Sequence, residues 1–426
     1  MTKLDVRGEL AVLGARAAAW ASRVSGKGSG GMIGGRVASK IDSGILPKLA
    51  RGKTSVIVTG TNGKSTTTKM INAALATRGA VAWNSNGDNM LDGVTAAMIA
   101  QARAPYASLE VDEMWTLKAS EAVHPAAFIL LNLSRDQLDR VGEIAKVERR
   151  IRDAVMLHPD AVVVANCDDP LIASAAWDCP NVVWVSAGSG WHSDSTSFPR
   201  TGTRVTFSDD GLWEVDETYR RPQPTWWVED AREGEAIDSA PILVTPQGRF
   251  PLRLRLPGRA NLGNAAQAVA CAWALGVPIE DAVAAVGSVG DVAGRYAHYH
   301  VSGKAVRVLL AKNPAGWQEA LTMIDATAPT VVFAVNGQVA DSTDLSWIWD
   351  VDFEGSLSLP AGTRVVACGE RGEDLAVRLR YAGVTAELAG DPWQVIQSAE
   401  PGRVEVLANY TAFRDLTAEF KKEGER

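Results

Sequence analysis

A glycine-rich turn with a lysine and a run of hydroxyl residues follows an apolar segment near the start of the chain. Residues 56–67 read V-I-V-T-G-T-N-G-K-S-T-T. Glycines let backbone N–H groups point at phosphate oxygens, and a helix that begins near Ser65 directs the positive end of its dipole toward them. Lys64 would neutralise the terminal phosphates. The sequence therefore predicts a binding loop for ATP or GTP.

The spacing of this loop is unusual. Gly60-x-x-Gly63-Lys64-Ser65 is two residues shorter than the common G-x-x-x-x-G-K-[ST] pattern, which indicates a narrower group of proteins. The alternative interpretation is a plain strand-to-helix connection, for which Gly, Asn and Thr are ordinary residues. We predict that the nucleotide is bound by Gly60, Thr61, Asn62, Gly63, Lys64, Ser65 and Thr66.

Hydroxyl and carboxylate side chains near the loop predict a magnesium site. Ser65 or Thr66 supplies the hydroxyl with which such loops hold Mg²⁺. Glu110 lies at the end of a second apolar run, and α/β proteins place their ligands at the carboxyl ends of strands. We expect Ser65 and Glu110 to bind Mg²⁺, and Lys64 and Glu110 to be catalytic. The alternative for Glu110 is a capping or surface carboxylate.

Length and composition favour a modular cytoplasmic enzyme. The 426 residues exceed one ordinary core, and a net charge of −7 gives no basic field, so we expect no nucleic-acid partner. No stretch is apolar enough for a transmembrane segment. Neither zinc nor a disulfide framework is predicted, because no C-x-x-C pair occurs among the four cysteines, Cys167, Cys179, Cys271 and Cys368.

Apolar runs alternate with helical stretches along most of the chain. The runs are 55–58, 107–109, 128–131, 161–165 and 182–185, followed by 305–310, 331–335, 365–367 and 404–407. Such alternation predicts an α/β fold with parallel sheets covered by helices on both faces. The expected domains are an N-terminal helical segment (1–50), an ATP-binding domain (51–294) with an irregular β-rich insertion (about 187–247), and a C-terminal α/β domain (295–426).

The N-terminal segment predicts an amphipathic helix. Leu10, Leu13, Ala17 and Trp20 recur at helical spacing. We expect this apolar face to pack on the protein, with contact to a membrane surface as the alternative. The glycine-rich residues 26–35 predict a flexible loop, and residues 36–49 predict a helix.

Taken together, these motifs resemble the Mur ligase superfamily, ATP-dependent enzymes that join a carboxylate to an amine through an acyl phosphate. The short loop, Glu110, Asn261-x-x-Asn264-Ala265-Ala266 and Gly294-Arg295 carry the resemblance. It implies a Mur ligase-like central ATPase domain and a smaller Rossmann-like C-terminal domain. It also implies that Asn264 contacts the adenine, and that Arg295 meets phosphate or helps to close the C-terminal domain.

Within the superfamily the chain resembles the MurT subfamily. Gln137 replaces the usual His in R-D-Q-L-D-R (135–140), and long C-terminal strings also match, at residues 312–316, 340–350 and 378–383. The resemblance implies a synthetase subunit that amidates the α-carboxyl of D-glutamate in the lipid II stem peptide. Ammonia would come from a GatD-type glutaminase in a heterodimer. Asp136 is a further candidate contact for metal or substrate.

The same resemblance implies a role for Asp344, which would complete the catalytic Cys and His of the partner glutaminase. An N-cap of the following segment is the alternative. Trp347 and Trp349 are expected on one face, in the core. Some MurT proteins carry a four-cysteine zinc ribbon within the insertion, but residues 187–247 contain no cysteine, so no zinc is expected.

Two other functions stay open. One is a peptide-adding Mur ligase or a folylpolyglutamate synthase-like ligase, which needs no glutaminase. The other is a nucleotide-regulated binding subunit. The expected location is the cytoplasm, with peripheral attachment at the inner face of the membrane as an open addition.

Overall fold

The computed structural model describes residues 4–24, 31–85, 87–134, 144–188, 194–229, 240–290, 296–341 and 344–424. These residues form two compact units, one of residues 4–134 and 144–290, the other of residues 296–424. The predicted boundary between residues 294 and 295 lies outside the described ranges. So do Asp136, Gln137 and Arg295.

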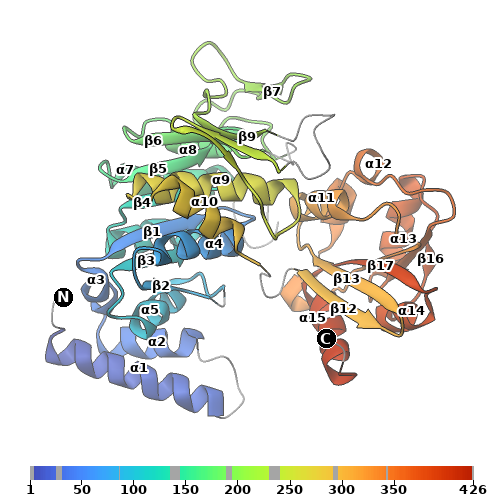
Figure 1. The fold of residues 1–426 in the computed structure, drawn as a ribbon, viewed down its shortest axis with the longest axis horizontal. Helices are drawn as coiled ribbons and strands as arrows, with labels where there is room; N and C mark the ends of the chain where they lie inside the picture. Colours follow the sequence, from blue (N-terminus) through green and yellow to red (C-terminus); the bar gives the residue numbers. More distant parts are fainter. Residues whose placement is uncertain are drawn as a thin grey trace. The chain divides into compact units, whose positions relative to one another are not determined.

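A nine-stranded sheet forms the centre of the first unit, in the order β11-β10-β9-β6-β5-β4-β1-β3-β2 (Figure 1). Strands β1 to β6 and β9 run parallel to one another. Strand β10 is antiparallel to both of its neighbours, β9 and β11. The strands are β1 (Thr54–Thr59), β2 (Val81–Trp83), β3 (Tyr106–Glu110), β4 (Ala127–Leu130), β5 (Val162–Asn166), β6 (Val182–Ser186), β9 (Trp226–Glu229), β10 (Ile242–Thr245) and β11 (Gly248–Pro251). All five apolar runs predicted in this part of the chain fall on strands, because continuous apolar runs suit strands that are buried on both faces.

Helices cover both faces of this sheet. On one face α4, α9 and α10 pack together, and on the other face α3, α5, α6, α7 and α8 share one core with Ile57, Phe128 and Val163 (Figure 1). The first group is α4 (Lys64–Ala76), α9 (Arg259–Ala274) and α10 (Ile279–Gly287), and the second is α3 (Ile45–Ala50), α5 (Leu91–Ala100), α6 (Thr116–Val123), α7 (Ile144–Met156) and α8 (Pro170–Ala176). The predicted two-sided α/β architecture is confirmed.

The first two helices, α1 (Val6–Val24) and α2 (Gly31–Ile41), stack outside α5. The predicted flexible loop over residues 26–35 is wrong for residues 31–35, which form the first turn of α2. A Cβ on Gly35 would lie 1.8 Å from Asp92 O, and one on Gly34 would lie 3.1 Å from Ala15 O. These glycines therefore allow close packing rather than flexibility. The single helix predicted over residues 36–49 is interrupted at residues 42–44.

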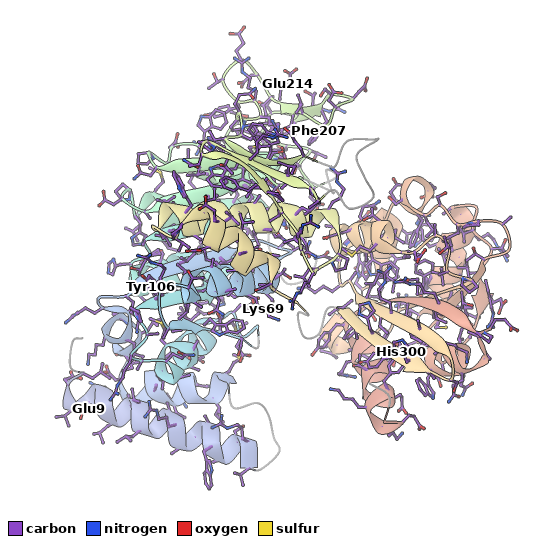
Figure 2. All side chains as sticks on the ribbon, viewed as in Figure 1. Glu9, Lys69, Tyr106, Phe207, Glu214 and His300 are labelled. Atoms are coloured by element: carbon purple, nitrogen blue, oxygen red, sulfur yellow. The ribbon has the colours of Figure 1, made fainter. Side chains whose placement is uncertain are left out.

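The segment predicted to be an insertion contains several short strands, and part of it belongs to the main sheet. Strands β9 and β10 extend that sheet beyond β6. A separate hairpin of β7 (Thr206–Phe207) and β8 (Trp213–Glu214) carries Phe207 and Glu214, both labelled in Figure 2. Buried Trp213 joins this hairpin to α8 through Phe198 and Ala173. The insertion thus shares a hydrophobic cluster with α8 of the first unit.

The second unit contains a six-stranded sheet in the order β12-β13-β17-β14-β15-β16, parallel except for β12. Its strands are β12 (Tyr296–Val301), β13 (Lys304–Leu310), β14 (Thr330–Ala334), β15 (Arg364–Cys368), β16 (Glu387–Leu388) and β17 (Gly402–Ala408). One face packs against α11 (Pro314–Met323), α12 (Phe353–Ser356) and α13 (Gly372–Tyr381), the other against α14 (Pro392–Ser398) and α15 (Tyr410–Lys422). This is the predicted smaller Rossmann-like unit, with one antiparallel edge strand.

Candidate functional site

The glycine-rich loop connects β1 to α4 in a conformation that needs glycine at two positions. Gly60 has φ of 136° and Gly63 has φ of 86°. A Cβ on Gly60 would lie 2.9 Å from Asn132 O, and a Cβ on Gly63 would lie 2.9 Å from the Asn264 side-chain oxygen. No described side chain caps the N-terminus of α4. A helix N-terminus without a side-chain cap has the character of a phosphate-binding site.

The segment after β4 fixes the shape of this loop. Asn62 N–H donates to Asn132 Oδ1 (2.9 Å), and Asn132 Nδ2 donates to Asn62 O (3.1 Å). Thr61 and Ser134 form a second reciprocal pair, in which Ser134 N–H donates to Thr61 Oγ1 (2.9 Å) and Thr61 Oγ1 donates to Ser134 O (3.0 Å). Thr61 and Asn62 were predicted to contact nucleotide. In the structure their hydrogen bonds to Asn132 and Ser134 hold the loop, so it is preorganised.

Lys64 lies inside the loop and pairs with an acidic residue that was not predicted to act there. Its Nζ donates to Gly60 O (2.5 Å), Thr61 O (3.2 Å) and Glu113 Oε1 (2.9 Å). Burial raises the pKa of Glu113, and the adjacent Lys64 ammonium opposes that rise. The signal for Glu113 is its place three residues after Glu110, where the chain turns back at the end of β3.

Glu110 has the environment of a metal ligand. It is buried, and within the described residues its carboxylate forms no hydrogen bond and no ion pair. Its backbone N–H and C=O both bond to the Asn84 side chain (2.9 and 2.8 Å). In the sheet, Glu110 lies beside Val58, two residues before Gly60. A buried carboxylate without a partner is costly unless a cation binds it.

Ser65 and Glu110 both lie beside the loop that contains Asn84 and Gly87. A Cβ on Gly87 would lie 3.9 Å from Ser65 Oγ, and Gly87 N–H bonds to the same Asn84 that holds Glu110. No group of three or more His, Cys, Asp or Glu side chains able to hold a metal occurs in the described ranges. Mg²⁺ does not need one, since it is usually bound by one or two carboxylates together with phosphates and water. The residues present fit the predicted magnesium site.

The asparagine motif of α9 lies against the phosphate loop. The Asn264 side chain lies so close to Gly63 that a Cβ at that position would be 2.9 Å from its Oδ1. Asn264 Nδ2 donates to Asn261 Oδ1 (3.4 Å). Gln267, one turn further, donates to Leu130 O at the end of β4 (2.8 Å). The structure thus brings Asn264 to the predicted nucleotide loop. Its contact with adenine stays a prediction.

Two neighbouring aspartates support the same edge of the sheet and were not predicted. Asp169 caps α8 and also accepts a bond from Leu133 N–H (2.8 Å). Burial raises the pKa of Asp169 to about 6, although three backbone N–H groups oppose the rise. Asp168 accepts bonds from Arg221 (2.6 Å) and Gly188 N–H (2.7 Å). The string N-C-D-D-P, directly after the apolar run of β5, is the signal that could have identified them.

In the second unit, the segment that leads to Asp344 is anchored by Asp341. Asp341 is buried and accepts bonds from Thr411 N–H (3.1 Å to Oδ2) and from the Thr411 hydroxyl at the start of α15. Burial raises the pKa of Asp341, and the Thr411 bonds oppose this. Asp341 therefore holds the preceding turn at the carboxyl edge of this sheet. Asp341 was not among the predicted site residues.

Asp344 is exposed and makes a local turn. Its Oδ1 accepts the N–H of Ser346 (2.9 Å), and this bonding lowers the pKa of Asp344. The structure therefore shows the local capping role that was the alternative for Asp344. The Asp344 carboxylate stays exposed at the surface. Trp347 is buried and Trp349 is exposed. Their predicted shared face is wrong, because residues 346–350 form a 3₁₀ helix rather than a strand.

The predicted residues therefore fall into two groups. The loop residues 60–66, Glu110 and Asn264 come together in the first unit, and Asp344 belongs to the second. Arg295 and Asp136 lie outside the described residues. The four cysteines are buried and free, and the absence of zinc stays a prediction.

A strand, a short glycine-rich loop, an uncapped helix N-terminus and a buried strand-end carboxylate define a nucleotide-dependent α/β protein. Residues 58–272 match the Mur ligase middle domain family, and residues 310–413 match the MurT ligase C-terminal family. The chain belongs to the Mur ligase family and, within it, to the MurT group. The predicted Mur-type, ATP-dependent ligase is confirmed.

Known proteins agree with this assignment over most of the chain. One relative is the lipid II isoglutaminyl synthase (glutamine-hydrolyzing) subunit MurT of Streptococcus pneumoniae, 29% identical over 92% of this chain and 93% of that protein. MurF from Acinetobacter baumannii has a similar fold, with a TM-score of 0.66 at 18% identity over 91% of this chain and 80% of that chain. A bifunctional folylpolyglutamate synthase/dihydrofolate synthase from Yersinia pestis, complexed with AMPPNP and Mn ion, has a TM-score of 0.59 at 16% identity over 88% and 91%.

Proposed function

We propose that this chain is the synthetase subunit of an enzyme that amidates the D-glutamate α-carboxyl of the lipid II stem peptide to D-isoglutamine. The observation that carries the proposal is the similarity along nearly the whole chain, including the C-terminal family, to a MurT subunit named for this reaction. ATP, Mg²⁺ and ammonia are the other reactants. The proposed location is the cytoplasmic face of the membrane, where lipid II would be met.

The reaction needs activation because an ionised carboxylate resists attack by a nucleophile. A carboxylate oxygen attacks the γ-phosphorus of ATP, ADP leaves, and an acyl phosphate forms. Ammonia then attacks the acyl carbon, the C–O bond to phosphate breaks, and phosphate leaves with its electron pair. The nitrogen loses a proton to give the amide. Negative charge accumulates at the transferred phosphoryl group. Lys64 and the N–H groups at the start of α4 are the groups placed to stabilise it.

When bound, Mg²⁺ would draw negative charge from the phosphoryl group being transferred. Ser65 and Glu110 are the proposed ligands from this chain. Asn62, Thr61 and their partners keep the loop open to phosphate without a rearrangement on binding. Asn264 is proposed to orient the nucleotide at Gly63.

Ammonia is proposed to come from a separate glutaminase of the GatD type. A glutaminase of this type uses a cysteine thiolate as its nucleophile, but the four cysteines of this chain are buried. Burial raises the pKa of the Cys179 thiol to about 11 and that of Cys368 to about 12, and it also raises the pKa of Cys167 and Cys271. These thiols are poor nucleophiles at neutral pH, which supports a partner as the source.

The Glu110→Gln variant should weaken Mg²⁺ binding and stabilise the fold. The Mg²⁺ concentration for half-maximal ATP turnover should rise about tenfold or more, because one charged ligand is lost. The melting temperature should rise, because an unpaired buried charge is removed. Glu121→Gln, at an exposed glutamate of α6, is the matched control. An unchanged Mg²⁺ requirement would remove Glu110 from the metal site.

The reaction itself is tested with the purified chain, ATP, Mg²⁺ and lipid II. The stem peptide is followed by mass spectrometry, with either ammonium or glutamine plus the candidate glutaminase as the nitrogen source. We expect exchange of a carboxyl OH for NH₂ with ammonium alone, and with glutamine only when the glutaminase is present. Addition of an amino acid to the peptide would instead favour a peptide-adding ligase. ATP hydrolysis without any mass change would favour a nucleotide-regulated binding subunit.

A further inference from the structure

An apolar stripe runs along the exposed side of α1. Its residues recur at steps of three, four or seven positions and so lie on one side of the helix. The exposed fractions are 75% for Val6, 55% for Leu10, 61% for Leu13, 63% for Trp20 and 69% for Val24. The predicted packing of Leu10, Leu13 and Trp20 on the protein is therefore wrong. From Val6 to Val24 the stripe is about 27 Å long, at 1.5 Å per residue.

The opposite side of the same helix makes the contacts with the protein. Its buried residues are small, namely Gly8, Ala11, Val12 and Ala15. Small side chains let α2 approach closely, and a Cβ on Gly34 of α2 would meet Ala15 O at 3.1 Å. In Figure 1, α1 is the outermost helix of its unit, with α2 between it and α5. The stripe therefore stays exposed although α1 is packed on α2.

The N-terminal segment is basic, whereas the rest of the chain is acidic. Residues 1–53 contain ten Lys or Arg and three Asp or Glu, a charge of +7. The whole chain has −7, so the remaining residues carry −14. In α1 itself, Arg7, Arg16 and Arg23 outnumber the single acidic residue Glu9. Asp5, just before the helix, is paired with Lys48 (2.8 Å). A basic segment on an acidic protein fits an anionic partner.

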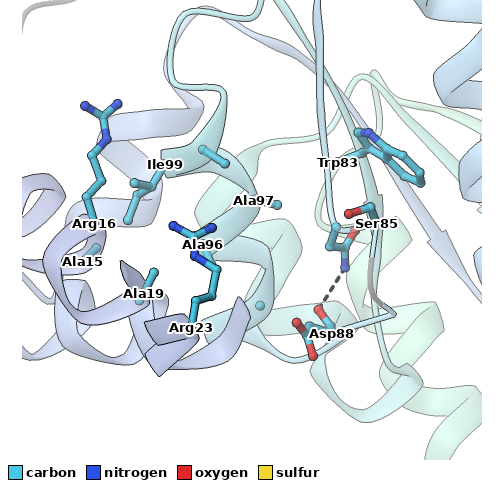
Figure 3. A pocket seen from close by; sticks show the side chains of 14 residues that line it. Ala15, Arg16, Ala19, Arg23, Trp83, Ser85, Asp88, Ala96, Ala97 and Ile99 are labelled. Carbon is cyan, nitrogen blue, oxygen red and sulfur yellow. Dashed lines mark hydrogen bonds between the residues drawn. The ribbon is translucent and has the colours of Figure 1, made fainter. Parts of the chain in front are cut away.

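Arg16 and Arg23 flank the stripe and line a pocket of about 350 Å³ with Trp83, Ser85 and Asp88 (Figure 3). Both arginines are exposed, and within the described residues neither forms an ion pair or hydrogen bond. Asp88 is the carboxylate on the opposite wall, and its backbone C=O accepts a bond from Asn84 Nδ2 (2.9 Å). Two unpaired guanidinium groups are therefore free to meet phosphate groups beside the stripe.

We propose that α1 binds the surface of an anionic lipid bilayer, with the stripe in the interfacial region and Arg16 and Arg23 at the phosphates. An apolar stripe with an aromatic residue and flanking arginines is the pattern of helices that lie in a membrane surface. Two copies of this basic segment would repel each other, which disfavours a homodimer through the same stripe. None of the helices in the described ranges is long and apolar enough to cross a bilayer. The inference deepens the proposed function, and rests on it for why a membrane would be the partner.

The test measures binding of the full chain to sedimented vesicles, without ATP or lipid II. Vesicles of phosphatidylcholine with one third phosphatidylglycerol should bind the protein, and pure phosphatidylcholine vesicles or high salt should weaken this binding. Leu13→Glu/Trp20→Glu should reduce affinity for the anionic vesicles about tenfold or more. Arg16→Glu/Arg23→Glu should reduce it and remove the salt dependence.

Met156→Glu/Leu157→Glu is the matched control, because it places two carboxylates at exposed apolar residues at the end of α7. It should bind as the unaltered chain does. The proposal is overturned if the unaltered chain does not sediment, or if the α1 variants sediment equally well. It is also overturned if the Leu13→Glu/Trp20→Glu variant instead separates a dimer or releases the glutaminase. Failure of amidation with normal vesicle binding would count against the proposed reaction alone.

Discussion

The Lys64→Ala variant is expected to lose amidation activity by about a thousandfold or more while keeping its affinity for the glutaminase partner. The lysine ammonium lies within the phosphate loop, bonded to Gly60 O and to Glu113. Without it, charge that develops on the transferred phosphoryl group is not compensated, and the loss of one such preorganised group commonly costs two to three powers of ten or more. Single-turnover amidation with ammonium measures the loss.

The same substitution also breaks a mostly buried ion pair, and the two effects must be separated. The side chains of Lys64 and Glu113 are 7% and 14% exposed. Removal of the lysine alone leaves the Glu113 carboxylate without its charge partner, at a cost of about 3 kcal/mol in unfolding free energy. The double variant Lys64→Met/Glu113→Gln removes both charges and should recover most of this stability. It should stay inactive.

Lys146→Ala is the control for the Lys64 variants, since Lys146 is exposed on α7 and its removal changes the net charge equally. Thermal unfolding and partner binding are measured on the same samples. Recovery of activity in the double variant would show that the lysine only neutralises Glu113. Loss of the partner complex in Lys64→Ala would contradict the assignment of the two roles to separate units.

The strands and the phosphate loop could be predicted because several local signals agree there. Apolar runs such as 55–58 suit strands buried on both faces, and Gly60, Gly63 and Lys64 are required by backbone geometry and by charge. The carboxyl edge of a parallel sheet then gathers whatever polar residues follow each run. This is why Glu110 reached the predicted site. Asn264 lies within α9, and only the resemblance to the Mur ligase superfamily placed it there.

Contacts across the fold explain what the sequence did not reveal. Glu113 and Asp341 are ordinary surface residues by type, and only their partners Lys64 and Thr411, distant in sequence, show why they are buried or paired. The glycines of α2 look like a loop until the approach of α5 is known. In α1, a large apolar stripe normally faces the core. Here the alanine side packs instead, because small residues allow the closer helix contact.

The Asp344→Asn variant is expected to lower glutamine-dependent amidation about a thousandfold while amidation from free ammonium stays unchanged. An aspartate that orients the partner's catalytic imidazole must be charged, since the charge fixes the tautomer and stabilises the imidazolium. Asparagine keeps a side-chain oxygen for the N–H of Ser346, which Asp344 bonds at 2.9 Å. The turn is preserved and only the charge is lost. Glutaminase activity of the reconstituted complex is the primary measurement.

This design separates the two interpretations of Asp344. If the residue only makes the local turn, Asp344→Asn should behave like the unaltered chain, and normal glutamine hydrolysis would remove Asp344 from the shared active site. Asp350→Asn is the control, because Asp350 is an exposed aspartate at the end of the 3₁₀ helix (Ser346–Asp350) that follows Asp344. Equal binding of both variants to the glutaminase is required. A loss of glutamine hydrolysis confined to Asp344→Asn would then mean that this charge acts on the partner's reaction and not on assembly of the complex.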